Sequence, residues 1–250
     1  MNRDRSTSER IENPFAARRV QPRTSTAAAV EAKGGLAGLR AMTGFEEEAV
    51  ERWASEPNTA RLCNRLLAHC LVPPGDDPTD ALARVRDAAI AERDVALVQL
   101  RRMSLGDRVE AEVACSACGR ANTIDFALSA LPLPEGAAPS EVRLETPDGS
   151  PVVARLPTAG DQEALLDETL ETAAERRTWL IARLMTRHGD RQGPFDPAEV
   201  HALPTAVRRA IETAIDEASP TVDLSMQVIC DACGHQMVEP FDVAGFFLLS

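Results

Sequence analysis

The chain carries the pattern Cys-x-x-Cys-Gly twice, and this repetition constrains the fold more than any other feature. It occurs in "EVACSACGRANTIDF" and again in "MQVICDACGHQMVEPF". Cys115 and Cys230 lie 115 residues apart, and the same separation relates Cys118 to Cys233. Apolar and polar residues alternate beside each pattern, as in half-buried strands. Each pattern is therefore predicted to form the turn of a β-hairpin that presents two thiols.

The separation of 115 residues extends far upstream of the cysteines. It relates pairs of identical residues along most of the chain: Arg40 and Arg155, Thr43 and Thr158, Glu48 and Glu163, and Phe126 and Phe241. We therefore predict an α+β fold made by tandem duplication of a hairpin-helices-zinc-knuckle unit, in residues 34–130 and 141–250. Residues 1–33 are expected to be a disordered basic arm, and residues 131–140 a Pro-rich linker.

Each copy is expected to follow one plan, with a hairpin first, helices next and the cysteine hairpin last. Residues 141–157 alternate around the turn signal Asp148-Gly149, which predicts the opening hairpin of the second copy. Its counterpart in the first copy is degenerate. Residues 161–187 contain no proline and are predicted to be one long helix or two. Further helices are expected at residues 44–54, 58–72, 78–103 and 196–218.

The spacing of the four cysteines favours zinc. A tetrahedral Zn²⁺ takes four Cys or His ligands, with sulfur at about 2.3 Å, and a tight turn of this kind supplies two of them. The glycine after each pair permits a positive φ, which turns backbone amides toward the sulfurs. The two hairpins are therefore predicted to pair into a zinc-ribbon-like site, in which both copies share one structural Zn²⁺ through Cys115, Cys118, Cys230 and Cys233.

Two other interpretations of the cysteine pairs remain open. A redox Cys-x-x-Cys pair normally lies at a helix N-terminus, where the dipole lowers a thiol pKa. Both pairs here lie between strand patterns, which disfavours a thiol oxidoreductase. The turns are alternatively vestigial, packed without a metal.

Other reactive side chains are assigned structural roles. Cys63 and Cys70 are seven residues apart on a predicted helix, about 10.5 Å along its axis, so they cannot chelate one ion and are expected in the core. Glu46, Glu47 and Glu48 are expected to form a solvated first turn, favoured by the helix dipole. His235 is expected at the surface or beside the metal site. No residue is assigned a catalytic or cofactor-binding role.

Charge and hydropathy exclude several classes of protein. The chain has 27 Lys and Arg against 39 Asp and Glu, a net charge of -12, which repels phosphate backbones. No stretch is apolar for the roughly 18 residues that a membrane span needs, and no signal peptide is recognised. We therefore expect a cytoplasmic protein that binds neither nucleic acid nor membrane. The apolar end, Phe246–Leu249, is expected to pack on the protein's own helices or dock into a partner.

The stretches "RLPTAGDQEAL" and "ERDVALVQLRRMSLGDRVEAEVACSACGRANTIDF" resemble the T4-like baseplate hub proteins and assembly chaperones of contractile phage tails and related injection systems. The likeness covers most of residues 34–250, with a long N-terminal arm and a weak first hairpin as departures. It implies a non-enzymatic protein that helps to build the baseplate or stays in the particle. Its partners would be other baseplate or tail proteins, with no small-molecule substrate. The alternatives are a zinc-ribbon regulator that contacts nucleic acid or a polymerase, and the thiol oxidoreductase.

Overall fold

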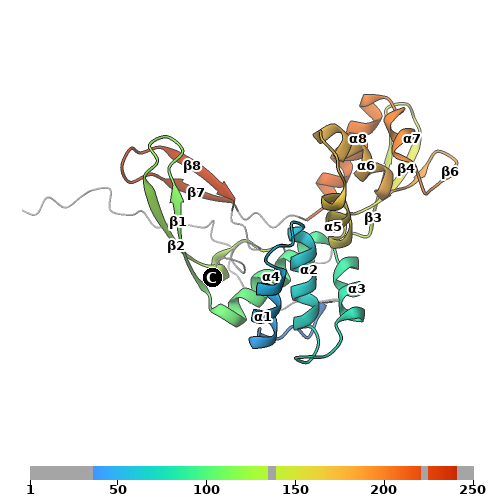
Figure 1. The fold of residues 1–250 in the computed structure, drawn as a ribbon. Helices are drawn as coiled ribbons and strands as arrows, with labels where there is room; N and C mark the ends of the chain where they lie inside the picture. The colour runs from blue at the N-terminus through green and yellow to red at the C-terminus, as the bar shows by residue number, and fades with distance from the viewer. Residues whose placement is uncertain (1–35, 135–138, 221–224, 241–250) are drawn as a thin grey trace, which may run out of the picture.

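The computed structural model describes residues 36–134, 139–220 and 225–240, which form two bodies and a pair of hairpins (Figure 1). The first body is helical and comprises α1 (Gly44–Trp53), α2 (Thr59–Cys70), α3 (Thr79–Asp87) and α4 (Ile90–Leu105). The hairpins lie side by side and together are called the ribbon: β1 (Arg108–Ala114) with β2 (Ala121–Ala127), and β7 (Ser225–Ile229) with β8 (Gln236–Pro240). The predicted N-terminal arm and the apolar end Phe246–Leu249 lie outside the described residues.

Leucine and valine side chains from all four helices form the core of the first body. The short 3-10 turn after β2, Leu128–Ala130, adds the fully buried Leu128. Cys63 and Cys70 are both buried here, which confirms the prediction that they line the core. The central members of this core are Leu36, Val50, Leu66, Leu67, Val85, Val98 and Leu100.

A buried ion pair fixes the start of α1. The guanidinium of Arg40 donates to both carboxylate oxygens of Glu46, at 3.0 and 2.8 Å, and the backbone N–H and hydroxyl of Thr43 donate to the same carboxylate. The side chain of Glu46 is only 1% exposed. The expectation of a solvated Glu46 was therefore wrong, because Arg40 precedes the helix and folds over its first turn. Glu47 and Glu48 are exposed, as expected.

The second body combines an antiparallel sheet, in the order β3-β4-β5-β6, with four helices (Figure 1). The strands are β3 (Glu141–Glu145), β4 (Pro151–Arg155), β5 (Met185–His188) and β6 (Arg191–Gln192). The helices are α5 (Ala159–Asp167), α6 (Ala173–Leu184), α7 (Pro197–His201) and α8 (Thr205–Ala218). Its core is separate from that of the first body and includes Val152, Ala154, Ile181, Leu184, Val207 and Ile211.

The predicted helical stretch at residues 161–187 is two helices and the start of a strand. Thr172 caps the N-terminus of α6. Its hydroxyl accepts from the N–H of Glu175 at 3.1 Å, and the Glu175 carboxylate accepts from the N–H of Thr172. The expectation that Met185 is helical was wrong. Met185 is buried and pairs with Ala154 of β4, and this tertiary pairing outweighs the helical propensity of the local sequence.

The order of elements recurs along the chain with the separation found in the sequence. Helices α1 and α5 begin 115 residues apart, as do α4 and α8, and so do strands β2 and β8. The ion pair at the start of α1 recurs as well: Arg155 donates to the buried Asp161, which accepts the N–H of Thr158 at 2.9 Å. Gene duplication explains this recurrence but stays a prediction.

The buried pair of Arg40 and Glu46 makes stability depend on pH. Burial alone would raise the pKa of Glu46, but hydrogen bonds from Arg40 and Thr43 outweigh it and lower the pKa from 4.5 to about 2. The ionised carboxylate therefore stabilises the fold fully above pH 4.5, and this contribution is lost as the pH falls toward about 2. Glu46→Gln should lower the free energy of unfolding by about 2 kcal/mol at pH 7.

Thermal or urea denaturation of wild type and Glu46→Gln between pH 7 and pH 3 checks this. The difference in free energy of unfolding between wild type and Glu46→Gln should become smaller as the pH falls. Both proteins keep the same cysteines and the other carboxylates, so the gap isolates Glu46. A gap that stays constant over this range would contradict the proposed role of the ion pair.

Candidate metal centre

The four cysteines of the two Cys-x-x-Cys-Gly patterns lie at the turns of the two hairpins of the ribbon. Strands β1 and β2 pair antiparallel from Arg108 with Ala127 to Ala114 with Ala121. Strands β7 and β8 pair in the same way, ending with Ile229 opposite Gln236. Each turn therefore follows directly from a paired strand, as the alternating sequence predicted.

The two turns have the same backbone hydrogen bonds. The N–H of Cys115 donates to the carbonyl of Arg120 at 2.8 Å, and that of Cys230 to His235 at 2.9 Å. In each turn the glycine N–H donates to the carbonyl of the first cysteine, at 2.8 and 2.9 Å. These glycines have φ values of 72° and 71°, which side chains with a β-carbon rarely adopt.

The structure brings the four predicted ligands together. The Sγ atoms of Cys115, Cys118, Cys230 and Cys233 all lie within 4.8 Å of one another. The closest approaches cross between the hairpins: Cys115 to Cys233 and Cys118 to Cys230, both at 3.7 Å. Four sulfurs placed about 2.3 Å from a central ion in a tetrahedron would be separated by about 3.8 Å. The arrangement therefore fits a tetrahedral metal ion, with two ligands from each hairpin.

Further contacts between the hairpins obey the same separation of 115 residues. The N–H of Ser116 donates to the Sδ of Met237 at 3.4 Å, and the N–H of Asp231 donates to the Oδ1 of Asn122 at 3.0 Å. Asp231 is the counterpart of Ser116, and Met237 is the counterpart of Asn122. The hairpins thus contact each other through an approximately twofold arrangement, which the two 3.7 Å sulfur pairs also follow.

Asn122 is a structural residue of the site that our sequence analysis missed. It is buried, and its amide nitrogen also donates to the carbonyl of Arg120 at 2.9 Å within its own turn. The alternation of β2 gives the signal that could have identified it, because Asn122 lies on the same strand face as the buried Ile124. A buried amide at this position holds the second turn against the first.

The second hairpin packs with the first body through the first hairpin. Val228, Met237 and Cys230 belong to the same buried cluster as Val109 and Ile124. Helix α8 precedes this hairpin in the chain, yet its residues belong to the other core. The ribbon therefore links a late segment of the chain to an early one.

The sulfurs differ in their tendency to ionise. Hydrogen bonds from the N–H groups of Cys233 and Ala232 lower the pKa of Cys230 to about 6. At Cys233 the N–H of His235 also lowers the pKa, but hydrogen bonds shared with Cys118 and its other sulfur neighbours outweigh this and raise it to about 12. Neighbouring thiolates would repel one another at this separation, which is an electrostatic penalty. A bound divalent ion removes this penalty, because it deprotonates coordinating thiols.

His235 lies beside the cluster and not in it. Its Nε2 atom is 3.1 Å from the hydroxyl of Ser116, and the imidazole is exposed, in agreement with the expected surface position. Neither cysteine pair is at a helix N-terminus, where a redox thiol would gain reactivity. Among residues 36–134, 139–220 and 225–240, this is the single group of three or more Cys, His, Asp or Glu side chains placed to bind a metal.

Comparison with known proteins agrees with the resemblance seen in the sequence. The family model described as "T4 bacteriophage base plate protein" matches residues 27–248. No curated protein and no solved structure gives a significant match. Within the described residues, no helix is both long enough and apolar enough to cross a membrane. The match covers both bodies and both cysteine hairpins, and the chain therefore belongs to the T4 bacteriophage base plate protein family.

Proposed function

We propose that this protein is a non-enzymatic assembly protein of the baseplate of a phage-like contractile tail or injection system, as a chaperone or a retained component. The observation that carries this proposal is the family match over residues 27–248. Assembly takes place in the cytoplasm, and a retained component would remain in the particle. The partners are other baseplate or tail proteins.

We further propose that the cysteine cluster binds one structural Zn²⁺. Four thiolates in a tetrahedron suit zinc, and a shell closed by four protein ligands is typical of structural zinc sites. Catalytic zinc sites keep a position for water or substrate. A complete four-sulfur shell leaves no such position, so the ion is proposed to stabilise the protein and not to act on a substrate.

The zinc is proposed to act between the two copies of a duplicated unit. Each hairpin supplies only two ligands, and the hairpins are joined by a long stretch of chain that includes the second body. Structural zinc contributes on the order of 10 to 16 kcal/mol near neutral pH. Metal binding therefore fixes the end of the second copy on the first body, and gives partner proteins one continuous surface made from both copies.

A shared zinc site makes a specific prediction about single cysteine variants. Cys115→Ser and Cys230→Ser should each reduce the zinc content from about one ion per chain to well below half. They should also lower the melting temperature, because each leaves three ligands. Cys70→Ala is the matched control, since this cysteine is buried in the core of the first body and is not one of the four clustered sulfurs. The control should lose stability but keep its zinc.

Metal analysis of each purified variant, together with its melting curve, gives the answer. Full zinc occupancy in both Cys115→Ser and Cys230→Ser would contradict a site shared between the hairpins. A purified wild type with no metal, or with iron in place of zinc, would contradict the proposed identity of the ion. Neither result would affect the assignment to a baseplate family.

The assembly role predicts a stable complex with a neighbouring tail protein. Co-expression of the tagged chain with the adjacent tail genes should yield a partner at a fixed ratio, measured by native mass spectrometry. A Cys118→Ser/Cys233→Ser variant should retain less of this partner if the ribbon positions the binding surface. Consistent recovery of the isolated chain from every co-expression would count against an assembly role.

A further inference from the structure

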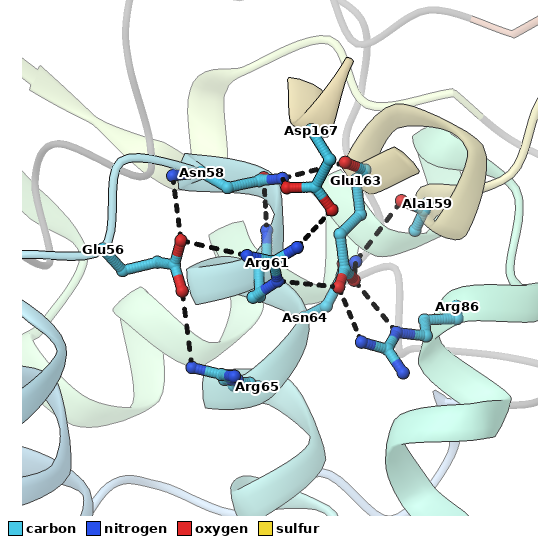
Figure 2. A network of polar contacts seen from close by, with 9 residues as sticks. All are labelled: Glu56, Asn58, Arg61, Asn64, Arg65, Arg86, Ala159, Glu163 and Asp167. Carbon is cyan, nitrogen blue, oxygen red and sulfur yellow. Dashed lines mark hydrogen bonds and ion pairs between the residues drawn. The ribbon is translucent and has the colours of Figure 1, made fainter. Parts of the chain in front are cut away.

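A network of polar contacts joins the two bodies (Figure 2). Helix α5 of the second body lies against α2 and α3 of the first. At its centre, the carboxylate of Glu163 accepts from Arg86 at 2.6 and 3.0 Å, from Asn64 at 2.9 Å and from Arg61 at 3.2 Å. The Glu163 side chain is 7% exposed, so a buried anion from one body is enclosed by donors from the other.

Contacts with the first body also occur at both ends of α5. Asn58 donates from its amide to the carbonyl of Glu163 and to the carboxylate of Asp167, both at 2.8 Å, and Asp167 also pairs with Arg61. At the N-terminal end, the two backbones touch. A β-carbon at Gly160 would lie 3.1 Å from the carbonyl oxygen of Arg86, and the Ala159 N–H donates to Ala88 at 2.9 Å.

Neither hydrophobic core crosses this interface. Among the described residues, the buried clusters of the two bodies share no member, and the second cluster is formed by the sheet, α6 to α8 and the neighbouring Leu156 and Phe195. Separation of the bodies would expose mainly carboxylates, guanidiniums and amides, which water solvates well, together with small residues such as Ala88 and Ala159. Polar interfaces between folded units are of the kind that open and close, whereas a shared apolar core would not separate.

A comparison of corresponding helices indicates that Glu163 serves the interface and not its own helix. Its counterpart on α1, 115 residues earlier, is Glu48, whose side chain is 75% exposed. The counterpart of Gly160 is Phe45, which is 60% exposed. An α1-type helix therefore folds with this face in solvent, and α5 does not need Glu163 to remain helical.

We propose that the contact of α5 with α2 and α3 is a latch, which opens without unfolding either body. The chain enters the second body from the first body and leaves it toward the ribbon, so both ends of the second body stay joined to the rest of the protein. Opening therefore changes the angle between the bodies but does not release the second one. It uncovers a cationic and amide-bearing face on α2 and α3, and an acidic face on α5. The latch depends on the contacts of Figure 2 and not on which ion the cysteines bind.

The latch is tested in the full-length, metal-loaded chain with Glu163→Arg, which places a cation against Arg61 and Arg86. Small-angle X-ray scattering should show a larger radius of gyration. Hydrogen exchange should rise at least tenfold in α5 and in the facing turns of α2 and α3. Helical circular dichroism and metal content should stay at wild-type values. Reversal of the pair in Glu163→Arg/Arg86→Glu should restore both compactness and protection.

Glu48→Arg is the matched control, because it makes the same change at the corresponding exposed position of α1 and should alter none of these measurements. Glu163→Gln is a milder second variant, which removes the charge and should speed exchange by about 10- to 100-fold. Unchanged compactness and protection in Glu163→Arg would overturn the latch. Loss of helical signal from either body in both Glu163 variants would overturn it as well, since the contact would then belong to a core.

Discussion

The close approach of four sulfurs from two hairpins 115 residues apart in the chain is the constraint on which the rest of the architecture depends. Two turns with the same hydrogen bonds bring two pairs of thiols to a separation of 3.7 Å, which suits a shared tetrahedral ion. Structural zinc supplies on the order of 10 to 16 kcal/mol, which is comparable with the whole stability of a domain, roughly 5 to 15 kcal/mol. The proposed ion at this point would therefore decide whether the second hairpin stays on the first body.

The ribbon and the helical bodies follow different symmetries. In the ribbon several contacts have a partner related by 115 residues, as in the exchange between Ser116–Met237 and Asp231–Asn122. In the bodies, Glu163 of α5 is enclosed by the first body, whereas the corresponding Glu48 lies in solvent. The ribbon is thus approximately twofold, whereas the contact between the bodies is not. The ribbon would be closed by the proposed metal and the bodies are joined by hydrogen bonds, so the two connections would respond to different conditions.

How far the sequence predicts this structure depends on the range of the interactions. The turns of the ribbon could be predicted, because a Cys-x-x-Cys-Gly pattern between alternating strands is a local signal. Met185 was assigned to a helix because its pairing with Ala154 is a tertiary contact that no local pattern reveals. Glu46 and Glu163 present the same difficulty. Both lie in helices rich in charge, and only the position of an arginine from another element distinguishes a buried carboxylate from a solvated one.

The chemistry of the two connections also bears on assembly. A protein that must present surfaces from both bodies needs them joined, yet it must adapt to a partner whose shape it meets during assembly. A single apolar core would make the arrangement rigid, while a flexible linker alone would leave the second body free to rotate. A metal at the proposed cysteine site, combined with a polar, hydrogen-bonded contact, would give an intermediate result. In the proposed latch, the bodies would stay close together, and their relative angle would change at the cost of hydrogen bonds that water replaces, while each body keeps its own core.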